Sequence, residues 1–369
     1  MIIMYLIACI PLFIGAGMFI YSKKINWIEW LVGSLSGFIV AGLVHGIVIV
    51  GLTHDTETWS GTVTGARYEP RWVEEYQVAI YKTVRDSKGN SHQVFSHYET
   101  RHRTHGPDWT VYCNIGKEWD TSINQSQYED LKKKFGEEYS ISGSRPGYDS
   151  GDRNDYLIKN VNNYIQPMST TYSFQNKIKA AKSIYSFITV PEGTPVFEYP
   201  TNDLFISNRL LGESKKRIDI LSFDRLNSSL GPIKLVNLIV VGFPKDKDSM
   251  ISKYQESKWI GGKKNDLVIC YGESDSGKAN WSYCFGWTDK SLVKRNLESI
   301  FLENTIDNNI LEKIKQEVIK NYVIKDWSQF DYITIDPPMW GYVILIILMI
   351  ISQGLIWFFF STNEMDKNS

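Results

Sequence analysis

The chain has 369 residues and a formal net charge of −1, from 40 basic and 41 acidic side chains. This balance provides no basic field for nucleic acid, so we expect no nucleic-acid partner. Aromatic residues make up 14% of the chain, which favours packed cores over disorder.

Three apolar segments, at residues 2–21, 30–52 and 339–360, are each long enough to cross a hydrocarbon core of about 30 Å as a helix. The only acidic, basic or imidazole side chain within them is His45. We therefore predict three transmembrane helices, with the lipid bilayer as a partner. His45 is an intramembrane polar candidate, and a neutral imidazole that hydrogen-bonds a neighbouring helix is the alternative interpretation.

The loop between the first two apolar segments is short and contains Lys23 and Lys24. Short loops with lysine are retained in the cytoplasm. Residues 53–338 are therefore expected on the outer side, in the periplasm of a bacterial inner membrane. A secretory signal peptide is the alternative interpretation of the first segment.

Two pairs of glycines in the second apolar segment are spaced four residues apart, which lets helix backbones approach closely. This spacing suggests a contact between two copies of the chain, and so a homo-oligomer. The glycines are Gly33 and Gly37, and Gly42 and Gly46.

The outer region is expected to begin with a small antiparallel β domain at residues 53–135. Polar and apolar residues alternate at 60–68 and 76–84, and a turn at 87–90 leads into a further run at 93–98. These runs predict hairpins.

A short helix is expected at 126–135, at the end of this domain. Residues 136–155 then have the composition of a linker, and residues 156–218 are expected to be irregular with some strands.

The last part of the outer region, residues 219–325, alternates between helical and strand patterns, which predicts an α/β sandwich. The whole chain is thus expected to be a membrane-anchored α+β protein. Helices are predicted at 219–230, 247–260, 290–301 and 310–323, and strands at 235–241, 267–271 and 281–287.

Four of the six histidines lie close together in the first domain, and three of them, His97, His102 and His105, are candidate metal ligands. Arg101 and Arg103 lie among them and would repel a cation. Exposed hairpin histidines without a metal are therefore the alternative interpretation.

Cys270 and Cys284 are equally distant from Gly277 in a predicted hairpin. A turn centred on this glycine would place the two cysteines opposite each other, close enough for a disulfide. Two separate core thiols are the alternative.

Residues 272–279 nearly match a phosphate-binding loop, but Ala279 replaces the hydroxyl residue and a strand follows instead of a helix. A polar hairpin loop accounts for the same residues. We therefore expect no nucleotide or other cofactor.

A resemblance to the TPM-domain family covers residues 223–323. It is carried by LVNLIVV at 235–241, KWIGGKKNDLVI at 258–269 and FGWTD at 285–289. This family includes thylakoid-lumen acid-phosphatase-like proteins and membrane-anchored bacterial relatives. The resemblance implies an α/β sandwich, with Asp266 and Asp289 as candidate catalytic or calcium-binding residues.

A second resemblance covers the whole chain and is to membrane proteins of tailed bacteriophages. It is carried by DTETWSGTVTG at 55–65, just after an apolar segment, and by YETRH at 98–102. It implies a phage-encoded protein of the host inner membrane.

These observations favour a non-enzymatic inner-membrane protein whose periplasmic region binds another envelope or phage protein. A membrane-anchored phosphatase of the TPM type, with Asp266 and Asp289 at its site, is one alternative. A metal-sensing outer domain that uses the histidines is another.

Overall fold

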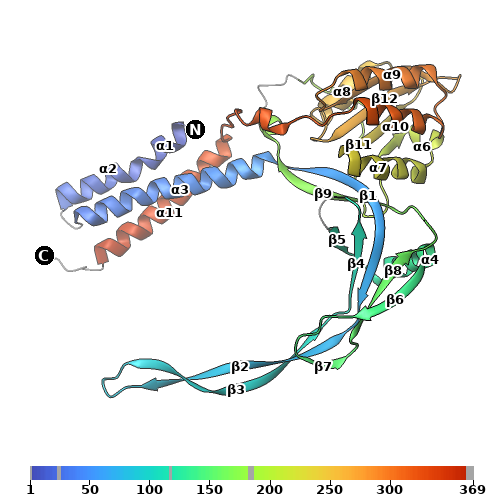
Figure 1. Ribbon diagram of the computed structural model, residues 1–369. Helices are drawn as coiled ribbons and strands as arrows, with labels where there is room; N and C mark the ends of the chain where they lie inside the picture. Colours follow the sequence, from blue (N-terminus) through green and yellow to red (C-terminus); the bar gives the residue numbers. More distant parts are fainter. Residues whose placement is uncertain (1, 23–25, 116–118, 182–186, 363–369) are drawn as a thin grey trace.

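The computed structural model describes residues 2–22, 26–115, 119–181 and 187–362. It is a mixed α+β protein with three sheets, and a bundle of apolar helices extends to one side of them (Figure 1). Lys23 and Lys24, on which the expected orientation in the membrane depends, lie outside the described residues.

Two helices, α3 (Trp27–Thr53) and α11 (Met339–Thr362), are long and apolar enough to cross a membrane. The prediction of three such helices is wrong for the first apolar segment. That segment is divided into α1 (Ile2–Ala8), α2 (Ile10–Gly17) and the π-helical turn η1 (Met18–Ser22). Pro11 lies just after the break, and proline cannot donate the backbone hydrogen bond that would continue α1.

α3 begins earlier than expected because Asn26 caps it. The Asn26 side chain accepts a hydrogen bond from the Glu29 backbone N–H, and the Glu29 carboxylate accepts one from the Asn26 backbone N–H. At its other end, α3 continues directly into the first strand.

The small residues of α3 pack within the chain's own bundle. A Cβ atom at Gly33 would lie 2.3 Å from the Trp357 ring of α11, and one at Gly37 would lie 2.9 Å from Pro11 of α2. These two glycines are therefore already covered, whereas a Cβ atom at Gly42 or Gly46 would meet no described atom within 4 Å beyond its own helix backbone. Only the latter pair keeps the open face that a second copy of the chain would need.

The first sheet is built on one long strand, β1 (His54–Glu69), which Figure 1 shows curving from the end of α3 down to the hairpin. Its first half pairs with β9 and its second half with β4 and β8. The other strands are β4 (Asp108–Cys113), β5 (Trp119–Ser122), β6 (Gly136–Ser142), β8 (Asn154–Asn160) and β9 (Pro167–Gln175).

The helix α4 (Gln125–Phe135) agrees with the predicted helix at 126–135. It buries Tyr128, Leu131 and Phe135 against Val63 and Val111 of the first sheet. The linker prediction for 136–155 is wrong, because this segment forms β6, β7 and the start of β8. This segment is ordered because its strands pair with distant residues, and local composition does not indicate such pairing.

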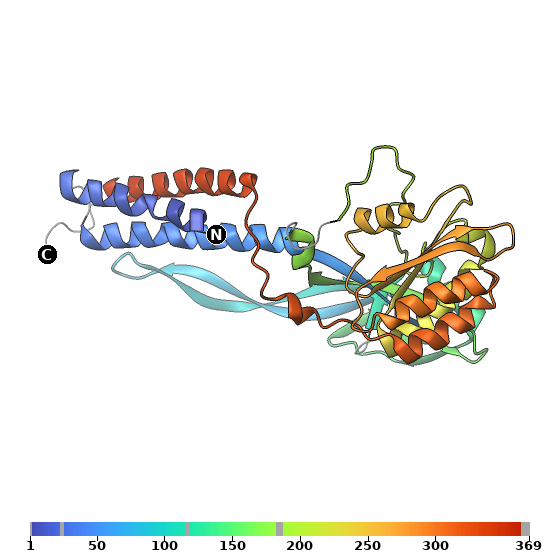
Figure 2. The same cartoon turned by 90° about the horizontal axis from the view of Figure 1, so that it is seen from above.

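The second sheet is a long hairpin. It contains β2 (Trp72–Arg85) and β3 (Ser91–His105), with the short β7 (Tyr148–Gly151) beside the base of β2. The predicted turn at 87–90 falls between β2 and β3. Figures 1 and 2 both show the hairpin extending away from the α/β unit, on the side on which the apolar helices lie.

The third sheet has the order β10-β11-β12-β13, with β13 antiparallel to the others. One of its faces packs against α7, α9 and α10, and the other against α8, so the expected α/β sandwich is present. The strands are β10 (Leu210–Gly212), β11 (Asn237–Phe243), β12 (Asp266–Glu273) and β13 (Ala279–Gly286). The helices are α7 (Ile220–Lys234), α8 (Met250–Lys258), α9 (Leu292–Glu303) and α10 (Ile310–Asn321).

Three short helices complete the chain: α5 (Lys177–Ala180), α6 (Ser214–Arg217) and the 3-10 helix η2 (Trp327–Phe330). η2 lies on the segment that returns from the α/β unit to α11. Its Trp327 packs edge-on against Trp287, with ring centroids 5.6 Å apart.

The candidate disulfide does not form, and the alternative of two core thiols holds, because Cys270 and Cys284 are free, buried and on opposite faces of the third sheet. Cys284 pairs with Ile269, and Cys270 with Tyr283. The register therefore differs by one residue from the expected one, and a shift of one residue moves a side chain to the other face.

Candidate functional site

Asp266, the first candidate carboxylate, is fully buried at the start of β12. It accepts hydrogen bonds from the Tyr199 hydroxyl at 3.0 Å and from the Asn237 amide at 2.7 Å. The Lys263 backbone N–H donates a third, also at 2.7 Å. Because both oxygens are engaged and neither reaches the surface, this arrangement favours a structural role for Asp266.

The turn before Asp266 explains how the sequence builds this arrangement. Gly261 and Gly262 have φ angles of 76° and 85°, in the left-handed region that glycine tolerates. The turn brings the Lys263 backbone N–H back onto the carboxylate. The segment 258–269 therefore supplies the Asp266 carboxylate together with one of the donors that enclose it.

Asp289, the second candidate carboxylate, lies on the surface three residues after β13. Lys325 places its Nζ atom 3.3 Å from the Asp289 Oδ1 atom, and the Asp289 side chain is 37% exposed. A cavity of about 290 Å³ beside it is lined by Trp287, Lys294 and other residues, but by neither candidate carboxylate. The two cavities described below, beside Lys263 and beside Arg209, are likewise lined by neither carboxylate.

A further cavity, of about 190 Å³, lies where β1 leaves α3 and meets the α/β unit. Lys263 is one of its lining residues. The Lys263 Nζ atom is 2.7 Å from the Thr56 hydroxyl, 3.9 Å from the Asp55 carboxylate and 4.5 Å from the centre of the Tyr199 ring. These contacts tie the start of the outer region to the α/β unit. Local sequence pattern does not indicate the contact with Thr56, which is 207 residues away from Lys263 in the chain.

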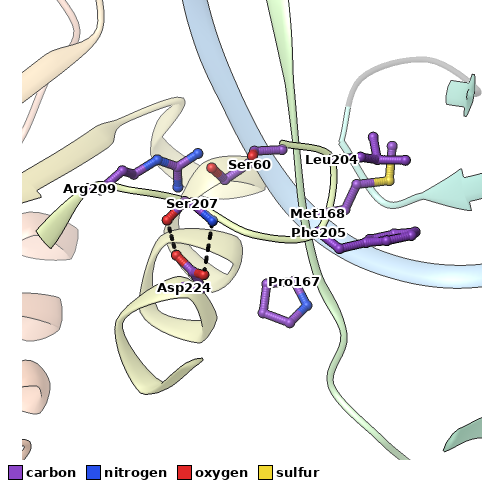
Figure 3. A pocket seen from close by; sticks show the side chains of 9 residues that line it. Ser60, Pro167, Met168, Leu204, Phe205, Ser207, Arg209 and Asp224 are labelled. Carbon is purple, nitrogen blue, oxygen red and sulfur yellow. Dashed lines mark hydrogen bonds between the residues drawn. The ribbon is translucent and has the colours of Figure 1, made fainter. Parts of the chain in front are cut away.

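Arg209 is a buried charge that the sequence analysis did not identify. It is 1% exposed and lies beside Ser60 of β1 and Asp224 of α7 (Figure 3). Its Nε and Nη2 atoms have no hydrogen-bond partner among the described residues. The Ser207 hydroxyl and backbone N–H both donate to the Asp224 carboxylate. The adjacent cavity of about 10 Å³ has room for one water molecule.

The charges at this contact between β1 and α7 influence each other. Burial raises the pKa of Asp224, while the Ser207 hydrogen bonds and the positive charge of Arg209 oppose the rise. Burial also lowers the pKa of Arg209, and the negative charge of Asp224 opposes that shift. The two buried charges therefore influence each other, although no ion pair or hydrogen bond joins them among the described residues.

The burial of Asp266 leads to a pH prediction. Burial raises the pKa of Asp266 above its ordinary value of 3.8. Between the unfolded and folded pKa values, the folded state holds a proton that the unfolded state has released. The free energy of unfolding should therefore fall as the pH rises through this window, by about 1.4 kcal/mol for each unit of pKa shift.

Denaturant unfolding of the full chain in detergent between pH 4 and pH 7 measures this slope. Asp266→Asn should flatten it, and Asp289→Asn, at an exposed carboxylate, should leave it unchanged. Equal slopes for the wild type and Asp266→Asn would show that burial of this carboxyl has no such effect.

The candidate histidines do not converge on one point. His105 stacks on Trp72, with ring centroids 4.3 Å apart, and its Nε2 atom is 2.8 Å from the Glu74 carboxylate. The Nδ1 atom of His97 is 3.1 Å from the Ser96 hydroxyl. His102 instead lies near Asp149 of β7, with 3.5 Å between the Nδ1 and Oδ2 atoms.

The base of the hairpin is fixed by a buried ion-pair network that the sequence analysis missed. The Arg145 and Asp155 side chains are 3% and 2% exposed, and their Nη2 and Oδ1 atoms are 2.5 Å apart. Arg67 also pairs with Asp155, and Arg145 lies over the Trp72 ring at 5.3 Å. Arg145 was placed in the predicted linker, where nothing in the sequence marked it as buried.

The far part of the hairpin, by contrast, exposes aromatic side chains. Tyr81, Phe95 and Tyr98 are 57%, 46% and 63% exposed. The Phe95 ring packs between the other two, with centroids 6.1 Å from that of Tyr81 and 5.0 Å from that of Tyr98. We call these three residues the aromatic cluster. Hydrophobic groups gathered at the surface in this way mark interaction sites more often than isolated ones do.

Comparisons with protein-family models, with curated proteins and with solved structures found no match to this chain.

Proposed function

We propose that this chain is a membrane-anchored, non-enzymatic protein that presents the hairpin β2–β3 to a protein partner. The hairpin is the observation that carries the proposal. Every residue of β3 except His105 is exposed, which is unusual for a strand of fifteen residues. An isolated two-stranded ribbon is only marginally stable in water, so a partner that covers it would stabilise it.

Both long edges of the hairpin support binding by strand pairing. Within the described residues, β2 pairs with β7 only at Trp72–Glu74, and β3 pairs only with β2. Their remaining backbone N–H and C=O groups point outward. Soluble proteins normally protect such edges, because they pair readily with another chain.

The aromatic cluster would supply the side-chain part of the contact. Tyrosine and phenylalanine bury a large apolar area with little loss of conformational freedom, and they are enriched in protein interfaces. Tyr81 and Phe95 of the cluster pair across the two strands, in the half of the hairpin away from its fixed base. A partner would therefore contact the hairpin where no other strand of this chain covers it.

The anchor in this proposal consists of α3 and α11. Side chains such as Leu43, Ile47 and Ile350 are 62%, 72% and 68% exposed on these helices, which suits contact with lipid. We place residues 53–338 in the periplasm of a bacterial host, with Lys23 and Lys24 in the cytoplasm. The pattern at 55–65 supports a phage origin, and an envelope or phage protein as the partner.

A phosphatase is less well supported, because the Asp266 carboxylate is fully buried and the Asp289 carboxylate is paired with Lys325. The hairpin contact can be tested in cells by placing a photo-cross-linking amino acid at position 98. We expect a defined adduct with one protein. The same amino acid at position 332 is the matched control, since Tyr332 is 75% exposed but lies outside the hairpin.

Replacing Tyr81 and Phe95 by serine should abolish the adduct at position 98, because the cross-linker remains but its apolar neighbours are gone. An adduct that survives these replacements, or one that forms equally at position 332, would contradict a specific hairpin contact. The absence of any adduct at position 98 would contradict it as well.

A further inference from the structure

Three side chains from the three strands of the second sheet meet near the base of the hairpin. They are Glu75 of β2, His102 of β3 and Asp149 of β7, and each offers a ligand atom within 4.8 Å of the other two. His102 lies directly opposite Glu75 in the β2–β3 register. Only one of the three, His102, was a candidate from the sequence.

An irregularity in the β2–β7 pairing places Asp149 in this group. Val73 pairs with Ser150 and Glu74 with Tyr148, so Asp149 is the extra residue between them. An extra residue of this kind turns its side chain out of the normal alternation of a strand. This change of direction brings the Asp149 carboxylate close to Glu75 and His102.

The charges in this group are unbalanced. Among the described residues, neither Glu75 nor Asp149 forms an ion pair with a lysine or an arginine, and the one basic partner is His102, 3.5 Å from Asp149. The two carboxylates repel each other at this separation. A cation bound between them would remove the repulsion.

We propose that Glu75, His102 and Asp149 bind a divalent transition-metal ion of the zinc class and thereby join β7 to the base of the hairpin. One imidazole and two carboxylates are a donor set that zinc accepts, with water as a fourth ligand. Calcium prefers six to eight oxygen ligands, which three side chains do not supply. The imidazole also favours zinc over magnesium.

The side chains can reach zinc-binding distances with small movements. Ligands arranged tetrahedrally around zinc lie about 3.4 Å apart, as their bonds to the metal of 2.0–2.1 Å require. The three side chains are exposed, so they are free to close from within 4.8 Å. Bound metal would reinforce a junction at which β7 and β2 are paired only over Trp72–Glu74.

Calorimetric titration of the metal-free full chain in detergent with zinc chloride tests the proposal. We expect binding at one site, weakened at least tenfold by His102→Ala and also by Glu75→Gln, because each removes a ligand. His92→Ala is the matched control, since His92 is an exposed histidine of the same strand that lies outside the group, and it should bind as the wild type does.

Cobalt(II) in place of zinc provides a second measurement that does not depend on heat. Its visible absorption should show four-coordinate binding in the wild type and lose this signal in His102→Ala. No zinc binding, or equal loss of binding in His92→Ala and His102→Ala, would overturn the proposal. Neither outcome bears on the cross-linking at position 98, which tests the protein partner separately.

Discussion

Replacing Arg209 by leucine should lower the free energy of unfolding by about 1–3 kcal/mol, because it removes the positive charge that offsets the buried Asp224 carboxylate. Arg209 is 1% exposed and Asp224 is 6% exposed, so neither is well solvated once its partner is lost. Denaturant unfolding of the full chain in detergent measures the loss.

The control is Arg217→Leu, which removes an arginine from a pair with Glu273 at the surface. The Arg217 side chain is 41% exposed, so this change should cost less than about 1 kcal/mol. The double variant Arg209→Leu with Asp224→Leu should recover much of the stability, because no charge then remains buried. Equal losses for Arg209→Leu and Arg217→Leu would mean that the buried pair has no special role.

Replacing Gly231 by alanine should cost about 2–3 kcal/mol, although alanine is the better helix former. A Cβ atom at this position of α7 would lie 1.7 Å from the Ser60 carbonyl oxygen of β1. Both sides of the contact are backbone, so no side chain can rotate away and α7 has to move off the strand.

Ser229→Ala tests the same helix without the clash. Ser229 is only partly buried and its hydroxyl donates to the Leu226 carbonyl of its own helix, so this change should be nearly neutral. Unfolding of the two variants is measured under the same conditions as for Arg209. A neutral Gly231→Ala would show that β1 and α7 do not approach as closely as described.

Local sequence pattern was sufficient to predict those helices, strands and turns that depend on neighbouring residues. The helix α4, the turn between β2 and β3 and the elements of the α/β unit from α7 onward follow the predictions, because periodicity and turn residues indicate them directly. The strand β10 was not predicted, since it lies in the segment expected to be irregular. In the first apolar segment hydropathy predicted a single span, and the break near Pro11 was missed because proline lies within an otherwise continuous apolar run.

Features that depend on distant residues could not be predicted. The register of β12 and β13 was off by one residue, which decides whether Cys270 and Cys284 meet. The segment after α4 resembled a linker, since its strands are defined by partners such as β1 and β2. The sequence shows a histidine-rich stretch, but the proposed metal site also needs Asp149, which lies in the segment predicted to be a linker.

The central claim is that α3 and α11 anchor the chain and that the hairpin, which extends on the side of these helices, is exposed on the outer face of the membrane. A membrane-impermeant maleimide tests it at Ser91→Cys, next to the hairpin turn, in a chain with Cys9→Ser; Cys113, Cys270 and Cys284 are buried. We predict that intact spheroplasts are labelled at position 91 and that the chain stays in the membrane pellet after alkaline carbonate washing. Labelling only after lysis, or release of the chain into the supernatant, would contradict the claim.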